Sequence, residues 1–221
     1  MRTSCLHNAK SVKADEYYTL MEDIEDELGN YNFDGAVIYC NCDNPFESNF
    51  YKYFKYNYDI LGLGGLYATC YKEGGIGYKA YYDGRTEIIE ELQGDGDFRS
   101  AECIELLKAC DMVVTNPPFS LFREFIDTLL KYHKKFLIIG PFLAVSYKNI
   151  LNYISDNLIW YGYTASKNKK FKVPDTYNHS HYDAEGNKLK AITITWYTNL
   201  PVDKQVPKLE LCNKYNAEYY P

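Results

Sequence analysis

Short apolar runs recur along the chain, and each has the length of a buried strand. They lie at 36–39, 66–69, 112–115, 136–139 and 158–161, and alternating positions at 192–197 add a late strand. Continuous apolar runs of this length are typical of strands that are covered on both faces. The pattern therefore predicts a sheet with other elements packed against each face.

Apolar residues at helical spacing fill most of the stretches between these runs. Helices are expected at 20–28, at 48–56, after Ser100, at 120–130 and at 148–153. Thr19 and Glu22 match a capping box at the start of the first helix, and Gly29 lies just past its end. Ser100 matches an N-cap. Strands that alternate with helices predict an α/β fold, with a mostly parallel, Rossmann-like sheet and helices on both faces.

The length and the turn composition favour a single domain. The chain has 221 residues, which suits one α/β domain spanning 1–221. Gly74, Gly75 and Gly77 favour a hairpin insertion at 71–85. Residues 163–190 are polar, basic and turn-rich, and they form a candidate loop for contacting a target.

Three loops are candidates for a binding site. Ligands of open α/β sheets bind beyond the carboxyl ends of the strands. The loops that meet this rule are 40–43, 94–98 and 115–119. Although they are far apart in sequence, they are expected to line one crevice.

The tetrapeptide Asn116-Pro117-Pro118-Phe119 carries the clearest chemical signal. An amino nitrogen on a planar ring is a poor nucleophile, and acceptors aimed at its N–H bonds stabilise the charge that develops on it. The Asn116 side-chain oxygen and the Pro117 carbonyl are two such acceptors, and Pro118 fixes the backbone between strand and helix. Phe119 offers a face for stacking a base.

A rigid Pro-Pro loop followed by a core phenylalanine is the alternative explanation of these four residues. Their place after one buried strand and before one helix favours the functional interpretation, since a motif is supported by its structural context. By itself the tetrapeptide predicts methyl transfer to the amino group of a planar or amide substrate.

The charge distribution gives a mixed picture of nucleic-acid binding. The net charge is −6, whereas a duplex-DNA binder usually carries a basic footprint. Local charge differs from this average. A lysine cluster, either a solvated face or a candidate contact to phosphates, comprises Lys167, Lys169, Lys170 and Lys172.

The cysteines indicate a reducing compartment and no metal. The chain has 7 of them, an odd number, and it shows no secretory signal or transmembrane run. Free thiols in a cytoplasm fit this usage. Cys40-Asn41-Cys42 lacks the paired C-x-x-C spacing of zinc sites, so metal binding is not expected.

With these residues in hand, the chain resembles the adenine-specific DNA methyltransferases, and within them the EcoRI-type methylase family. The resemblance runs from about Lys13 to about Thr198. It implies the fold of S-adenosylmethionine-dependent methyltransferases and assigns the catalytic role to 116–119. The segment 13–19 looks like an amino-terminal motif that closes over S-adenosylmethionine, with Tyr18 and Thr19 as contacts. A simple helix cap is the alternative role of Thr19.

The resemblance also implies the remaining cofactor contacts. Cys40, Asn41 and Cys42 stand where the first cofactor loop belongs, although the glycines common in the wider superfamily are missing. Asp97 and Phe98 resemble the loop that reads the cofactor adenine, and a turn before the next helix is their alternative role. No carboxylate follows the second strand at the position where many relatives bind the ribose.

The activity that the resemblance implies is transfer of a methyl group to the N6 nitrogen of an adenine flipped out of double-stranded DNA. No metal and no membrane are involved, and the setting is the cytoplasm of a bacterium or phage. Two alternatives stay open: an RNA adenine or protein-glutamine methyltransferase, and an inactive methyltransferase-like subunit. The chain is short for a separate recognition domain, so a homodimer, a partner subunit or loose specificity can supply target recognition.

Overall fold

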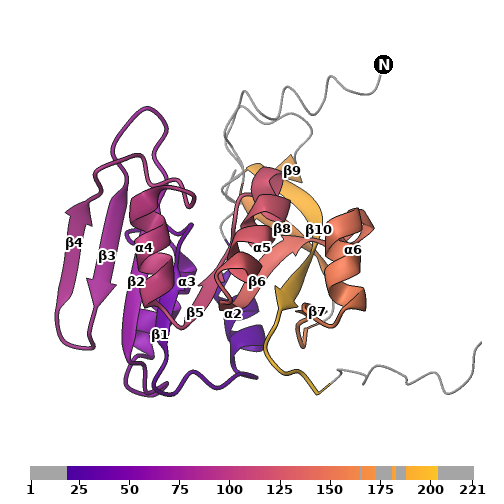
Figure 1. Ribbon diagram of the computed structural model, residues 1–221, viewed down its shortest axis with the longest axis horizontal. Coiled ribbons are helices and arrows are strands. Elements are labelled where there is room, and N and C mark those ends of the chain that lie inside the picture. The colour runs from indigo at the N-terminus through magenta and orange to yellow at the C-terminus, as the bar shows by residue number, and fades with distance from the viewer. Residues whose placement is uncertain (1–18, 165, 173–180, 183–187, 204–221) are drawn as a thin grey trace, which may run out of the picture.

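Across the residues that the structure describes, the fold is a ten-stranded mixed sheet with helices on both faces (Figure 1). The computed structural model describes residues 19–164, 166–172, 181–182 and 188–203, with backbone alone from 167 to 192. The strands are β1 Val37–Cys40, β2 Gly65–Cys70, β3 Tyr78–Tyr82, β4 Glu87–Glu91, β5 Met112–Thr115, β6 Lys135–Pro141, β7 Trp160–Tyr161, β8 Lys167–Lys172, β9 His181–Tyr182 and β10 Lys188–Thr198. The helices are α2 Met21–Leu28, α3 Asn49–Tyr56, α4 Ala101–Ala109, α5 Phe122–Lys131 and α6 Lys148–Ser155, with 3₁₀ turns η1 Phe119–Leu121 and η2 Phe142–Ser146.

The centre of the sheet is parallel and its two sides are antiparallel. The strand order is β4-β3-β2-β1-β5-β6-β10-β7, and β8 and β9 also pair with β10. β2, β1, β5 and β6 run parallel, while β3 and β4 extend one side and β10 and β7 the other in antiparallel register. The predicted α/β class is confirmed. Hairpin connections and the returning β10 make the outer parts antiparallel, because such neighbours need no crossover helix.

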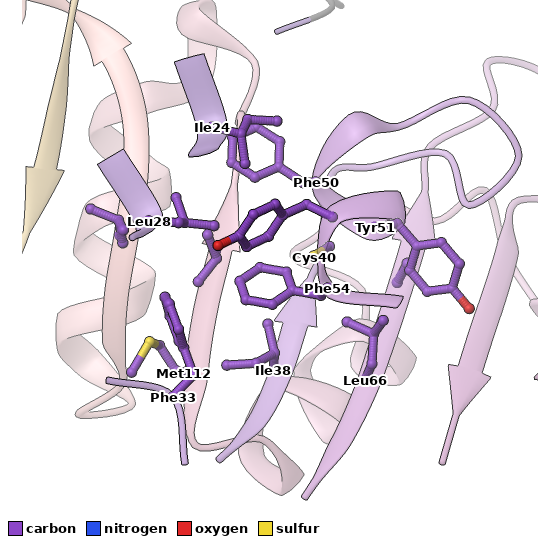
Figure 2. Close-up of a cluster of buried hydrophobic side chains, with 14 of the residues drawn as sticks. Ile24, Leu28, Phe33, Ile38, Cys40, Phe50, Tyr51, Phe54, Leu66 and Met112 are labelled. Carbon is purple, nitrogen blue, oxygen red and sulfur yellow. The ribbon is translucent and has the colours of Figure 1, made fainter. Parts of the chain in front are cut away.

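One core lies between the sheet and the helices α2 and α3. On β1, Ile38 and Cys40 point into this core, and Ile24 of α2 and Phe50 and Phe54 of α3 close it from the other side (Figure 2). Residues two apart on a strand share a face, so alternate residues of β1 reach this core. Each large apolar side chain buried here stabilises the fold by about 2 kcal/mol.

A second core lies on the opposite face of the sheet, under α4, α5 and α6. Tyr39 of β1 points into it, one residue away from the two that face α2 and α3. Helix α5 contributes the residues that its spacing predicted, namely Phe122, Phe125, Ile126 and Leu129, all buried. The predicted covering of both faces is therefore confirmed, which explains why the central strands read as continuous apolar runs.

Of the two predicted N-caps, the structure confirms the one at Ser100 and contradicts the one at Thr19. The Ser100 hydroxyl accepts a hydrogen bond from the Cys103 N–H at 3.2 Å and caps α4. The prediction that Thr19 caps the first helix is wrong, because Leu20 occupies the N-cap and makes no side-chain bond there. Thr19 instead makes tertiary contacts, and these outcompete a local cap.

More residues between 158 and 190 are in β-strands than the sequence pattern indicated. Of the expected strand 158–161, residues 160–161 form β7, while Leu158 is 47% exposed. The segment 163–190, expected as a turn-rich loop, contains β8 and β9, which pair with β10. Backbone pairing with a long neighbour does not require an apolar alternation, so the lysine-rich sequence of β8 carried no strand signal.

The glycine-rich segment 71–85 leads into a meander. It contains the connection from β2, the whole of β3 and part of the turn toward β4. β3 pairs with β2 and β4 pairs with β3. This ribbon lengthens the sheet on the side away from β5 (Figure 1). No helix in the described part of the chain has the length and apolar character needed to cross a bilayer.

Gly140 of β6 supplies a test of the packing. A Cβ atom at this position would overlap the buried ring of Phe122. We expect Gly140→Ala to lower the free energy of unfolding by about 2 kcal/mol, since overpacking forces a rigid ring to move. At Gly94 a Cβ would meet nothing within 4 Å, so Gly94→Ala is the control and should change stability by less than about 0.5 kcal/mol. Denaturant unfolding measures both, and equal losses would contradict the packing argument.

Candidate active site

The candidate site lies at the carboxyl ends of β1 and β5, in the middle of the sheet. From β1 the chain crosses to β2 on one side, while β5 lies on the other side of β1. Crossovers in opposite directions leave a gap beyond the strand ends, and ligands of open α/β sheets bind at such a switch point. Two of the three predicted loops, 40–43 and 115–119, begin at these strand ends.

The loops after β1 and β5 are joined by direct hydrogen bonds. The Cys42 N–H donates to the Thr115 hydroxyl oxygen at 3.2 Å. That hydroxyl in turn donates to the Asp43 carboxylate. Thr115 directly precedes Asn116, so these bonds fix the position at which the tetrapeptide leaves the sheet.

Asp43 was not singled out from the sequence, and it is the centre of this network. It is 7% exposed. Its other carboxylate oxygen accepts from the Ser48 hydroxyl at 2.6 Å, and its N–H donates to the Thr69 carbonyl at 3.0 Å. It therefore links the ends of β1, β2 and β5 to the start of α3. Its place two residues before Pro45, at the end of a strand, was the available sequence signal.

Thr19 lies beside the predicted catalytic asparagine. It is 5% exposed, and its carbonyl accepts from the Asn49 side-chain Nδ2 at 2.7 Å. The Asn116 Nδ2 donates to the Thr19 hydroxyl at 3.5 Å. The structure thus brings together residues 19 and 116, which the sequence assigned to the cofactor and the catalytic motif respectively.

The tetrapeptide itself forms a short turn against the core. Pro117 is buried, and Asn116, Pro118 and Phe119 are half-buried. The Pro118 carbonyl accepts from the Leu121 N–H at 3.0 Å, which closes η1. Phe119 packs against the edge of the core under α2 and α3, and the Asn116 Oδ1 atom is buried.

The side chains of the loop 40–43, which was predicted to bind the cofactor, are mainly buried. Cys40 is fully buried in the core, and this burial raises the pKa of its thiol well above the ordinary value. Asn41 is also buried, and its carbonyl accepts from the Thr69 hydroxyl at 3.3 Å. Cys42 is half-buried. A ligand at this loop would meet backbone groups before it met these side chains.

The third predicted loop is held to the end of β2. The Lys72 N–H donates to the Asp95 carbonyl at 2.7 Å, and Gly96 lies so close to the Cys70 carbonyl that a Cβ would overlap it. Gly96 has a φ of +82°, a conformation that glycine adopts without strain. The loop therefore needs Gly96 to bring Asp97 and Phe98 alongside β2.

Asp97 and Phe98 differ in exposure. Phe98 is buried and makes an edge contact with Phe125, with ring centroids 5.0 Å apart. Asp97 is half-buried, and Arg99 binds both of its carboxylate oxygens at 2.9 and 2.7 Å. The Oδ1 atom also accepts from the Arg99 backbone N–H at 2.8 Å, so Arg99 holds the Asp97 carboxylate by its main chain and its side chain.

Other predicted site residues lie outside the described side chains. Tyr18 is one of them. The backbones of Lys167, Lys169, Lys170 and Lys172 lie on β8. Within the described residues, no group of three or more His, Cys, Asp or Glu side chains is placed to hold a metal ion.

Comparison with known proteins identifies the family. The family described as adenine-specific methyltransferase EcoRI matches residues 5–221. The match covers nearly the whole chain, so the protein is a methyltransferase and belongs to this adenine-specific family. The resemblance read from the sequence is confirmed, and with it the enzyme class.

Sequence relatives agree with this assignment. The chain is 43% identical over 244 residues to Type II methyltransferase M.EcoRI of Escherichia coli, covering 98% of this chain and 75% of that protein. It is 38% identical to M.MgeORF184P of Mycoplasma genitalium and to M.MpnI of Mycoplasma pneumoniae, also named Type II methyltransferases, covering 97% of this chain and 71% of each relative.

One solved structure shows a weak overall likeness. It is described as a candidate RNA methyltransferase, PH1948 from Pyrococcus horikoshii, with a TM-score of 0.40 and 13% identity, covering 90% of this chain and 97% of the other. At that score the likeness is too weak to bear on fold or function.

The Asp43 network leads to a stability prediction. Asp43→Ala leaves the buried Ser48 and Thr115 hydroxyls without their acceptor, and we expect it to lower the free energy of unfolding by about 3 kcal/mol. Asp43→Asn keeps one acceptor oxygen and should cost less. Asp26 is exposed on α2, so Asp26→Ala is the matched control. Urea unfolding gives all three values, and an Asp43→Ala loss no larger than that of Asp26→Ala would overturn the assignment.

Proposed function

We propose that the protein transfers the methyl group of S-adenosylmethionine to the N6 nitrogen of an adenine flipped out of double-stranded DNA. The observation that carries this proposal is the placement of Asn116 at the end of β5, next to Thr19. Membership of an adenine-specific methyltransferase family supports the target atom. It also counts against a protein-glutamine substrate.

The orientation of the Asn116 amide suits a target amino group. Its Nδ2 atom donates to the Thr19 hydroxyl, so the oxygen is the end of the amide that accepts a bond. An amide oxygen and a backbone carbonyl of the tetrapeptide then accept the two N–H groups of adenine. This draws the amino nitrogen toward a tetrahedral shape and frees its lone pair for attack.

The chain's own residues account for the remaining steps. Phe119 offsets part of the cost of about a few kcal/mol for taking the base out of the duplex, by stacking on it. The loops after β1 and β5, joined through Thr115, hold donor and acceptor in line, and such positioning supplies a large part of the rate. S-adenosylmethionine supplies an activated sulfonium methyl group when bound. The neutral thioether of S-adenosylhomocysteine would be the leaving group, and the methylated nitrogen would lose one proton to water.

The cofactor residues proposed are Tyr18, Thr19, the backbone of Cys40, Asn41 and Cys42, and Asp97 with Phe98. Cys40, Asn41 and Cys42 lie at the carboxyl end of β1, and Thr19 lies beside Asn116. Asp97 and Phe98 lie in the loop held to the end of β2 by the Lys72 bond. Polar backbone at a switch point suits the charged methionine end of the cofactor, and Asp97 suits an adenine amino group. Their positions at adjoining strand ends fit one extended nucleoside-containing ligand.

The setting and the recognition of DNA are also proposed. The named relatives come from bacteria and are Type II methyltransferases, which supports a bacterial or phage cytoplasm and a place beside a restriction endonuclease. The lysines of β8, Lys167, Lys169, Lys170 and Lys172, are proposed to contact phosphates. A second copy of the chain or a partner subunit is proposed to complete the target-binding surface.

The Asn116→Ala variant tests the function. With tritiated S-adenosylmethionine and unmethylated duplex DNA, we expect kcat to fall by about 10²–10³ because one transition-state acceptor is lost. Cofactor affinity by calorimetry should stay unchanged. Asn152 is exposed on α6, and Asn152→Ala is the matched control with activity like the wild type.

Parallel reactions with RNA and with bulk protein distinguish the alternatives in that experiment. Label that enters DNA and disappears with Asn116→Ala supports the proposal. Label that enters RNA alone, or cofactor binding without transfer to any substrate, contradicts it.

Asp97 gives a separate test of the cofactor site. Asp97→Ala should raise the Kd for S-adenosylmethionine by about tenfold or more, since a bond to a charged acceptor is lost. Arg99→Gln removes the ion pair but keeps the carboxylate, so it controls for loop structure and should change the Kd little. Isothermal calorimetry measures both, and equal effects would assign Asp97 to the loop rather than to the cofactor.

A further inference from the structure

Glu27 of α2 is a fully buried carboxylate that the proposed reaction does not use. It is 0% exposed. Its Oε1 atom accepts from the Tyr31 hydroxyl and from the Tyr163 N–H, each at 2.7 Å, and its Oε2 atom accepts from the Thr164 N–H at 2.7 Å. Two successive backbone N–H groups are thus bound by the two oxygens of one side chain.

The neighbouring residues are arranged around this carboxylate. A Cβ atom at Gly162 would overlap Glu27 Oε1, so glycine is needed for the approach. The Tyr31 and Tyr163 rings meet edge to face with centroids 5.4 Å apart. Burial and the Glu27 charge raise the pKa of Tyr31 above its ordinary value, which keeps its hydroxyl protonated as a donor.

The bound backbone is the root of a β-hairpin. We define the root as 162–164 and the basic hairpin as the paired strands β8 and β10. The Gly162 N–H donates to the Trp196 carbonyl at 3.0 Å, β7 before the root pairs with β10, and β8 after it pairs with β10 at Lys167 and Ile194. The root therefore sets where β8 begins to pair with β10.

The same helix reaches the candidate active site at its other end. Thr19 precedes α2 and accepts from Asn116, and the Ile24 N–H donates to the Leu20 carbonyl at 3.3 Å at the start of the helix. An eight-residue helix spans about 12 Å, with a rise of about 1.5 Å per residue. Helix α2 is thus a short rigid connection between Asn116 and the hairpin root.

We propose that Glu27 is a positioning residue that fixes the basic hairpin relative to Asn116, so that duplex DNA held by the hairpin presents its adenine at the site. The inference rests on the proposed DNA methyltransferase function. A bidentate carboxylate holds two backbone donors in one geometry. Apolar packing would hold the root at a lower desolvation cost. A buried carboxylate here is therefore better explained by the positioning of the two backbone N–H groups than by a gain in folding stability.

The test uses the full chain with Glu27→Gln and Glu27→Asp. The amide of Gln offers one acceptor oxygen for two backbone N–H groups, and Asp is shorter by one methylene. We expect the KM for unmethylated plasmid DNA to rise at least about tenfold in Glu27→Gln. The Kd for S-adenosylmethionine by calorimetry should stay within about twofold, because the cofactor residues are untouched.

Two matched variants control for charge and packing. Glu25 is exposed on the same helix, and Glu25→Gln should leave both constants unchanged. Tyr31→Phe removes one donor but keeps both backbone bonds, so its KM for DNA should change much less than that of Glu27→Gln. Glu27→Asp should fall between the wild type and Glu27→Gln.

The outcomes separate this inference from the function on which it rests. A wild-type protein that labels no DNA contradicts the proposed function. A wild type that methylates DNA, with Glu27→Gln variants that lose melting temperature but keep the KM for DNA, overturns the inference and leaves Glu27 a structural residue. Equal rises in the DNA KM and the cofactor Kd overturn it as well.

Discussion

The hydrogen bonds that join the ends of β1 and β5 are the constraint on which the proposed chemistry depends. Thr115 accepts from the Cys42 N–H and donates to Asp43, and the next residue is Asn116. A parallel sheet brings strand ends together but does not determine how the loops beyond them approach each other. Here a buried carboxylate with several donors sets that approach to within hydrogen-bond distance. The loops proposed to hold the cofactor and the target base are consequently joined by hydrogen bonds, which suits the alignment that in-line methyl transfer requires.

Helix α2 connects these joined loops to the part of the sheet formed by β10 and β7. Its amino-terminal end is held by Asn49 and touches Asn116 through Thr19, while Glu27 near its carboxyl end binds the root of the basic hairpin. The helix packs on the core that contains Phe50 and Phe54 (Figure 2). Packing against a dense core limits its freedom to shift. One short helix can therefore fix the distance and orientation between the basic hairpin, which is proposed to contact DNA, and the candidate site at Asn116.

Many helices and strands could be predicted from the local sequence pattern, and the successes and failures have different physical causes. The strand 112–115 and the helix capped by Ser100 were predicted because burial and capping leave a strong local signal. The cap at Thr19 was predicted wrongly because its hydroxyl has a tertiary use that no local rule describes. The strand β8 was not predicted, because it is defined by its pairing with β10 and not by a pattern of its own. Elements defined by their own periodicity were found, and those defined by a distant neighbour were missed.

The sequence by itself determined the class of the protein. The tetrapeptide 116–119 indicated methyl transfer to an amino group, and the resemblance to a family, confirmed over residues 5–221, identified adenine as the target. The chemistry and the family resemblance both follow from residue types at short spacing, which can be recognised in the sequence without a structure. The tertiary structure alone decided which groups Asp43 and Glu27 contact. Each is an ordinary acidic residue in sequence, and its contacts lie as far away as Thr115 and Thr164. A buried carboxylate takes its function from the donors that surround it, and only folding brings those donors together.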